Sequence, residues 1–81
     1  AKQMFRKGLY LNPEHLLSHL MLGNILNNEG NKRAASIHYR NVIQITEKIK
    51  DDDIIKVTGG MNKERLRQMV IKLIESQNEQ G

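Results

Sequence analysis

The chain has 81 residues, no cysteine and a net charge of +4. This length allows one domain with a small core, and the lack of cysteine excludes disulfides, thiolate nucleophiles and thiolate metal sites. Lysines and arginines are scattered among acidic residues, which disfavours nucleic acid as a partner. No apolar run approaches the roughly 20 residues that cross a bilayer, and no secretory leader opens the sequence, so we expect a cytoplasmic protein without membrane contact.

The first predicted helix covers residues 1–11, where apolar residues gather on one face. Because the first residues already resemble the middle of a helix, we expect the chain to be a piece of a longer one. Asn12 is placed to cap the next helix, and Pro13 suits its first position. We predict this second helix over residues 13–29, packed on two sides because its apolar residues cover more than half of its circumference.

The third helix is predicted over residues 32–49. Gly30 is placed to adopt the left-handed conformation after the second helix, and Asn31 to cap the third, so the two helices should run antiparallel. Three consecutive aspartates, residues 51–53, would oppose the dipole at a helix C-terminus. We therefore expect the third helix to end near Lys50.

The rest of the chain is predicted as a linker, a helix and a tail. Residues 51–61 contain β-branched residues but have no second strand to pair with, which favours an extended linker. Apolar residues then mark one face of an amphipathic helix over residues 62–76, with Asn62 as its cap. Residues 77–81 form a polar tail that is expected to fray.

Two segments of the sequence repeat each other at an offset of 34 residues: Ala1 and Phe5, for example, recur as Ala35 and Tyr39. This period is typical of tetratricopeptide arrays, in which each repeat is a helix-turn-helix hairpin. Residues 1–50 resemble the second helix of one repeat followed by one complete repeat. The residues that match the family signature are packing residues: Ala1, Phe5, Gly8, Pro13, Leu22, Gly23, Leu26, Gly30, Ala35 and Tyr39.

The expected fold is therefore all-α, with antiparallel tetratricopeptide hairpins and a C-terminal capping helix over residues 62–76. Three positions depart from the family pattern. His19 replaces an aromatic residue, Val42 stands where alanine is commoner, and Glu47 stands where a closing proline is usual. The missing proline suggests that the array ends here.

A narrower resemblance is carried by four strings: residues 5–13, residues 19–24, residues 39–41 and residues 58–66. They are similar to the C-terminal repeat region of CheR-type chemotaxis methyltransferases. The resemblance implies that a catalytic domain upstream of this chain methylates receptor glutamates with S-adenosylmethionine. The chain itself would then hold no catalytic or cofactor-binding residue and would act as an adaptor for a protein or peptide partner.

Helical hairpin arrays expose the first helix of each repeat on a concave face where peptides lie. Asn24 resembles the groove asparagine that bonds the main chain of a ligand, although asparagine is also common beside the Leu-Gly pair of the signature. The predicted partner-binding groove consists of Leu17, Leu20, Asn24, Asn27 and Asn28.

Three further interpretations stay open. His15 and His19 lie four residues apart and should share a helix face, but no third ligand follows at helical spacing, so no metal site is predicted. Arg6 and Arg40 occupy equivalent places in the two copies, and further basic residues lie elsewhere at Lys32, Arg33, Arg65 and Arg67. These residues form either solvated faces or a basic groove for an acidic peptide. The first helix lacks a hairpin partner, and its exposed face could instead mediate a homodimer.

Overall fold

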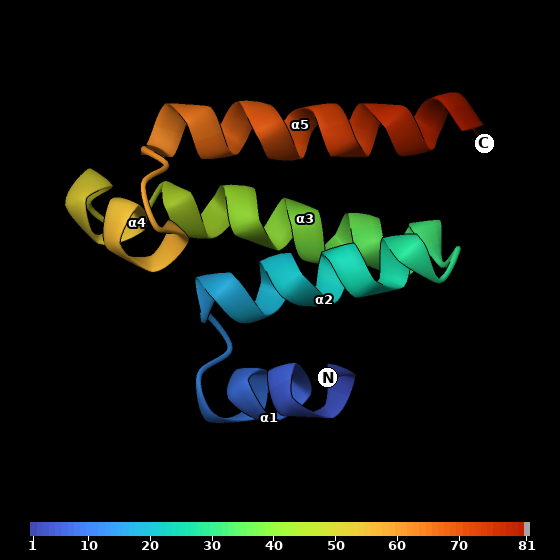
Figure 1. Ribbon diagram of the computed structural model, residues 1–81, viewed down its shortest axis with the longest axis horizontal. Coiled ribbons are helices and arrows are strands. Elements are labelled where there is room, and N and C mark those ends of the chain that lie inside the picture. The colour runs from blue at the N-terminus through green and yellow to red at the C-terminus, as the bar shows by residue number, and fades with distance from the viewer. Residues whose placement is uncertain (81) are drawn as a thin grey trace.

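The structure is a computed structural model that describes residues 1–80, with side chains up to Gln77. Within this range the chain forms five helices and no strand. Figure 1 shows four of them stacked in successive layers, with α4 at one end of the stack. The all-α fold class is therefore confirmed, and no described helix is long and apolar enough to cross a membrane. The helices are α1 (Lys2–Leu11), α2 (Leu16–Asn28), α3 (Lys32–Thr46), α4 (Asp51–Thr58) and α5 (Lys63–Gln80).

The core lies mainly between α2 and α3, which run antiparallel, and α5 adds a further layer on α3 (Figure 1). The turn between α2 and α3 is built as predicted. Gly30 has a φ of 87°, and the Asn31 side chain accepts a hydrogen bond from the backbone N–H of Ala34 at 3.4 Å. The buried apolar cluster contains Leu16, Leu20, Leu26, Ala35, Tyr39, Val42, Ile45, Ile54, Leu66 and Val70.

A glycine and a tyrosine set the close approach of α2 and α3. Gly23 is buried, and a Cβ atom at this position would lie 2.6 Å from Cε1 of the Tyr39 ring. The ring is completely buried, and its hydroxyl donates a hydrogen bond to Oδ1 of Asn24 at 2.6 Å. The missing side chain at Gly23 therefore makes the space into which the aromatic ring packs.

The signature residues of the 34-residue repeat differ in burial between the two copies. Those on α2 and α3 are all buried: Leu22, Gly23, Leu26, Ala35 and Tyr39. On the N-terminal side, Phe5 and Gly8 are half-buried, whereas Ala1 is exposed. Pro13 and Gly30 lie exposed in the two turns. The helices of the complete copy, α2 and α3, thus pack against neighbours on both sides, whereas α1 packs mainly against α2.

The predicted start of the second helix is wrong by three residues. The Asn12 side chain accepts a hydrogen bond from the backbone N–H of Glu14 at 3.1 Å and so closes a turn that contains Pro13. His15 is the actual cap of α2, since its Nδ1 accepts from the backbone N–H of Ser18 at 3.2 Å.

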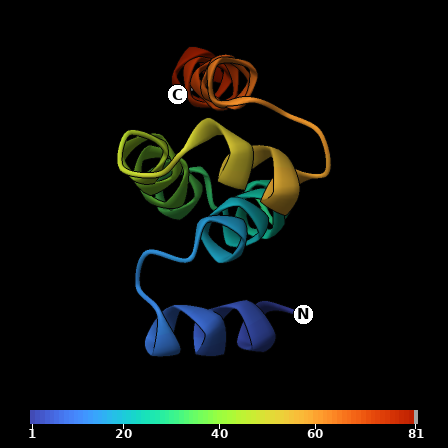
Figure 2. The same cartoon turned by 90° about the vertical axis from the view of Figure 1, so that its left-hand side faces the viewer.

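The predicted extended linker over residues 51–61 is also wrong. The chain leaves α3 at Thr46, and residues Asp51–Thr58 form α4. The aspartates oppose the dipole at the end of a helix, but in the first turn of a new helix the same negative charges are favourable. Ile54 is completely buried and anchors α4, and Gly59 ends it with a φ of 78°. Figure 2 shows α4 beside the α2–α3 pair and below the start of α5.

The predicted frayed tail is wrong for the residues that the structure describes, because α5 continues from Lys63 to Gln80. Asn62 caps this helix as predicted, accepting a hydrogen bond from the backbone N–H of Arg65 at 2.9 Å. The longer helix follows from Gln77, which is buried and hydrogen-bonded to α2 and α3. Gly81, the end of the predicted tail, lies outside the described residues.

Candidate functional site

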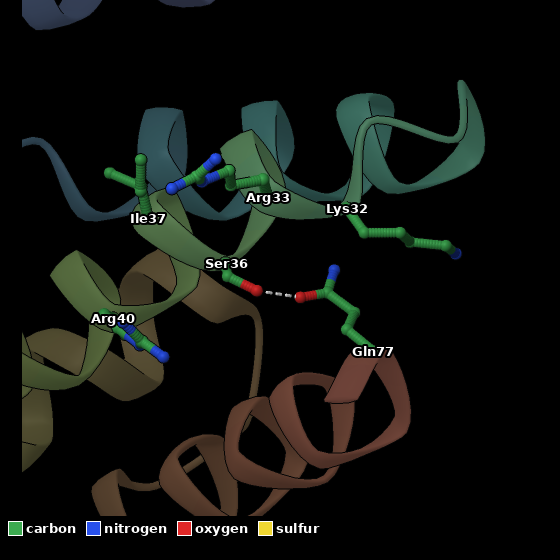
Figure 3. A pocket seen from close by; sticks show the side chains of 6 residues that line it. All are labelled: Lys32, Arg33, Ser36, Ile37, Arg40 and Gln77. Atoms are coloured by element: carbon green, nitrogen blue, oxygen red, sulfur yellow. Dashed lines mark hydrogen bonds between the residues drawn. The ribbon is translucent and has the colours of Figure 1, made fainter. Parts of the chain in front are cut away.

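A pocket of about 380 Å³ opens between α3 and the C-terminal part of α5 (Figure 3). Five of its lining residues come from α3, and the sixth comes from α5. Figure 3 shows the α3 side chains spread along one flank of the pocket and Gln77 reaching toward them from the other helix. The lining residues are Lys32, Arg33, Ser36, Ile37, Arg40 and Gln77.

Helical periodicity explains why these α3 residues share one face. Arg33, Ile37 and Arg40 are spaced by four and three residues, which places them in one row along the helix. The opposite face of α3 carries Ala35 and Tyr39, which are completely buried. Packing of that face in the core therefore turns the two arginines and the isoleucine outward.

A hydrogen-bond network fixes the wall of the pocket. The Ser36 hydroxyl donates to Oε1 of Gln77, as Figure 3 shows, and Nε2 of Gln77 donates to Oδ1 of Asn27 at 3.2 Å. Nζ of Lys32 donates to the same Asn27 oxygen at 2.8 Å. The network joins α2, α3 and α5, so the end of α5 is held where it closes one side of the pocket.

The pocket is electrostatically positive. Three of its six lining residues carry a positive charge, and none is acidic. The two ion pairs between side chains of residues 1–77 join Lys2 to Glu29 and Lys48 to Glu14, so neither involves a lining residue. A carboxylate or phosphate that enters can therefore take charge-assisted hydrogen bonds from guanidinium groups that have no such partner among the described side chains.

The comparisons with known proteins identify no relative. No protein-family model, curated protein or solved structure matches the chain significantly. Function is therefore inferred from the pocket and from the helices around it.

The predicted groove residues on α2 differ in burial. Leu20 is buried in the core, and Leu17 is half-buried. Asn24 is half-buried and accepts the hydrogen bond of the Tyr39 hydroxyl, while Asn28 is exposed. Asn27 alone belongs to the network that holds the pocket. The α2 groove stays a prediction, and the candidate site that the structure itself offers is the basic pocket on α3.

Sequence analysis missed Gln77, which it assigned to a polar tail. A signal was present, because Val70, Leu73 and Gln77 follow one another at intervals of three and four residues. This spacing continues the buried face of the last helix by one more turn. The polar character of glutamine concealed the continuation, since only its hydrogen bonds to Ser36 and Asn27 make its burial favourable.

A second polar cluster joins α2 to α3 through two histidines. His19 is buried, and its Nε2 lies 2.8 Å from the carbonyl oxygen of Pro13. Because a carbonyl only accepts hydrogen bonds, Nε2 carries the proton. Nδ1 of His19 then faces Nδ1 of His38 at 3.1 Å, and in the neutral pair His38 donates to His19. A single proton between the two Nδ1 atoms makes this hydrogen bond. If both Nδ1 atoms carried a proton, the two N–H groups would face and repel each other.

His15 and His19 do not share a ligand site. Nδ1 of His15 lies 2.8 Å from the hydroxyl of Ser18, whereas His19 bonds Pro13 and His38. Within the part of the chain that the structure describes, no three histidine, aspartate or glutamate residues gather as metal ligands.

We expect the folded chain to be less stable at pH 5.5 than at pH 7.5. Burial, followed by the nearby His19 and Arg6, lowers the pKa of His38 below its ordinary value of 6.5. The folded state therefore binds fewer protons than the unfolded state in this range. The contribution of His38 is fully present above pH 6.5 and is lost as the pH falls through the lowered pKa. Urea titrations followed by circular dichroism measure the difference.

The variant His38→Asn keeps an N–H donor near His19 but does not titrate, so its stability should change less between the two pH values. His15→Asn is the matched control, because His15 is exposed and asparagine is a good helix cap. This control should retain the pH dependence of the unmodified chain. An equal pH dependence in His38→Asn and in the unmodified chain would contradict the assignment to His38.

Proposed function

We propose that the chain is a protein-interaction module that binds an acidic segment of a partner protein in the basic pocket of α3. The observation that carries this proposal is the grouping of Lys32, Arg33 and Arg40 around one pocket, with no carboxylate among the lining side chains that the structure describes. Arginine binds carboxylates through parallel hydrogen bonds in a fixed plane, which gives geometric selectivity as well as attraction. The module performs no chemistry of its own in this proposal.

The finer proposal is that the chain belongs to the tetratricopeptide class of repeat proteins. The 34-residue offset supports it, because its two copies fall on α1 and α3, and both of these helices pack against α2. The burial of Gly23, Ala35 and Tyr39 supports it as well, since the same residues match the family signature. In this proposal α1 is the second helix of one repeat, α2 and α3 form the next repeat, and α5 is the cap.

The finest proposal is that the chain is the C-terminal adaptor of a chemotaxis methyltransferase in the bacterial cytoplasm. It is supported by the four strings that are similar to that family, of which the last, residues 58–66, spans the turn before α5. S-adenosylmethionine and the methylation of glutamates would then belong to a domain outside this chain. The partner would be an acidic segment of a receptor or of a regulator domain, which the pocket holds near the enzyme.

The double variant Arg33→Glu/Arg40→Glu tests the pocket. We expect at least a tenfold weaker affinity for a fluorescein-labelled glutamate-rich peptide, measured by fluorescence anisotropy, because two attractive charges become repulsive. Affinity for the unmodified chain should also fall between low and physiological salt. Both arginines are exposed, so the circular dichroism spectrum should not change.

Lys56→Glu/Arg65→Glu is the matched control for this experiment. It changes the net charge by the same amount, and both residues are exposed, on α4 and at the start of α5. The control should bind the peptide nearly as well as the unmodified chain does. Equal losses in the two double variants would mean that net charge, and not the pocket, attracts the peptide.

Self-association through α1 is a second candidate function. Among the described residues, α1 contributes none that is fully buried, and Met4, Tyr10 and Leu11 are 72%, 87% and 73% exposed. Positive charges on the exposed Arg6 and Lys7 oppose the pairing of two such helices. Sedimentation velocity over a hundredfold range of concentration separates the two candidates, because only self-association raises the mass. Nucleic-acid binding has only the net charge in its favour.

A further inference from the structure

One of the residues that line the basic pocket is an exposed apolar side chain. Ile37 is 57% exposed, although isoleucine is among the residues most often buried. It lies four residues after Arg33 and three before Arg40, in the same helical row. Along α3, the pocket therefore offers one branched apolar residue between two arginines.

The three cations of the pocket are not equally available. Nζ of Lys32 already donates a hydrogen bond to Oδ1 of Asn27 at 2.8 Å, within the network that holds Gln77. Arg33 and Arg40 are exposed, and neither takes part in an ion pair among the described side chains. The two arginines are thus the groups that a ligand meets first, one on each side of Ile37.

Charge alone would make this a weak site that selects a carboxylate but not the residues around it, because exposed ion pairs contribute little in water. Protein interfaces gain affinity when an apolar centre is excluded from water by a polar rim. Ile37 with its two flanking arginines has this arrangement. The partner that complements it presents an apolar side chain between two carboxylates.

The spacing of the arginines indicates the conformation of the partner. Seven residues of helix span about 10.5 Å, at about 1.5 Å per residue. A second helix running along α3 matches this distance when its carboxylates are also seven residues apart. The apolar side chain then lies three or four residues after the first carboxylate, on the same face of that helix.

We propose that the pocket binds an amphipathic helix of a partner protein with acidic residues at positions i and i+7 and a large apolar residue at i+3 or i+4. This inference rests on the proposed function and names the class of segment that the module recognises. Arg33 and Arg40 pair with the two carboxylates, and Ile37 packs against the apolar side chain. Gln77 holds the end of α5 in place beside the docked helix.

Three synthetic peptides of equal length and charge test this proposal with the complete 81-residue chain. The first has glutamates at i and i+7 with leucine at i+3 and i+4, the second moves the leucines to the opposite face, and the third replaces them with serine. We expect the first peptide to bind about tenfold more tightly than the other two, as measured by fluorescence anisotropy, because only it buries leucine against Ile37. Its circular dichroism spectrum should become more helical on binding.

Variants of the chain test whether the tighter binding of the first peptide depends on Ile37. Ile37→Ser should weaken binding of the first peptide about tenfold and leave the serine peptide unchanged, whereas Ile37→Leu should bind like the unmodified chain. Ile71→Ser is the matched control, since Ile71 is an exposed isoleucine of α5 that does not line the pocket. Ile37 is exposed, so its replacement should leave the fold intact.

Each outcome separates the two proposals. If all three peptides bind equally and Ile37→Ser has no effect, the helical recognition is wrong and the acidic-segment function stands. If no acidic peptide binds the unmodified chain, the proposed function fails together with the inference. A leucine-dependent gain that survives Ile37→Ser would place the apolar contact elsewhere and would also overturn the inference.

Discussion

Replacing Gly23 with alanine is expected to lower the free energy of unfolding by about 2 kcal/mol. The added Cβ would lie 2.6 Å from Cε1 and 2.8 Å from Cδ1 of Tyr39, well inside van der Waals contact. The ring cannot turn aside easily, because it is fully buried and its hydroxyl bonds Asn24. Overpacking of this severity costs about 3 kcal/mol, whereas alanine gains about 1 kcal/mol over glycine in a helix. The steric cost therefore exceeds the gain in helix propensity.

Gly8→Ala is the matched control, since it makes the same substitution in another packed helix. Its Cβ would meet Oγ of Ser18 at 2.7 Å, which is the end of a small side chain and not an aromatic ring. The hydroxyl can rotate away and give up its contact with His15, so the net change should stay within about 1 kcal/mol. Urea denaturation followed by circular dichroism measures both variants.

The clash can also be tested by removing its other partner. In the double variant Gly23→Ala/Tyr39→Leu, the loss should be smaller than the sum of the two single losses, because leucine does not fill the space of the ring. Additive losses, or equal effects of Gly8→Ala and Gly23→Ala, would show that contact with Tyr39 does not fix the approach of α2 to α3.

Replacing Ile54 with alanine is expected to destabilise the chain by about 3 kcal/mol, within the usual range for removing a buried isoleucine side chain. Ile54 is completely buried, and it is the one buried residue that α4 contributes to the described core. The remaining contacts of α4 are with α2 and α5. Loss of the Ile54 side chain should therefore release α4 from the core as well as leave a cavity.

Ile55→Ala is the control for this prediction, because the same substitution is made one residue later in the same helix. Ile55 is 37% exposed, so its replacement should cost well under the loss at Ile54, about 1 kcal/mol or less. Both variants gain the same helix propensity, and their difference isolates burial. Equal unfolding midpoints for the two variants would contradict the docking of α4.

Local signals in the sequence predicted most of the helices. Asn31 and Asn62 cap α3 and α5, and Gly30 has the left-handed conformation expected of it, because these roles depend on neighbours within a few residues. The aspartates at 51–53 were placed correctly at a boundary, but their effect on the following residues was misjudged. A charge run that ends one helix also favours the start of another, and only the burial of Ile54 selects the helix over a linker.

The candidate site was less accessible to sequence analysis than the fold. A basic groove was one of two open interpretations, but it rested on Arg6 and Arg40 at equivalent places in the two copies. The row of Arg33, Ile37 and Arg40 was not predicted, although helical spacing places these three residues on one face of α3. Two residues of the predicted groove on α2 are occupied within the fold, because Leu20 packs into the core and Asn24 bonds Tyr39. Which face of a helix is free depends on every element that packs against it, and α5 was expected to end before Gln77.

The sequence by itself determined that this protein is helical and that α2 and α3 pair through a tight turn. These properties follow from periodicity, caps and charge, which act over a few residues. The tertiary structure decided that α4 is a helix and that α5 extends over the pocket. Both depend on side chains far apart in sequence, since Ile54 needs a core to enter and Gln77 needs Ser36 and Asn27 as partners.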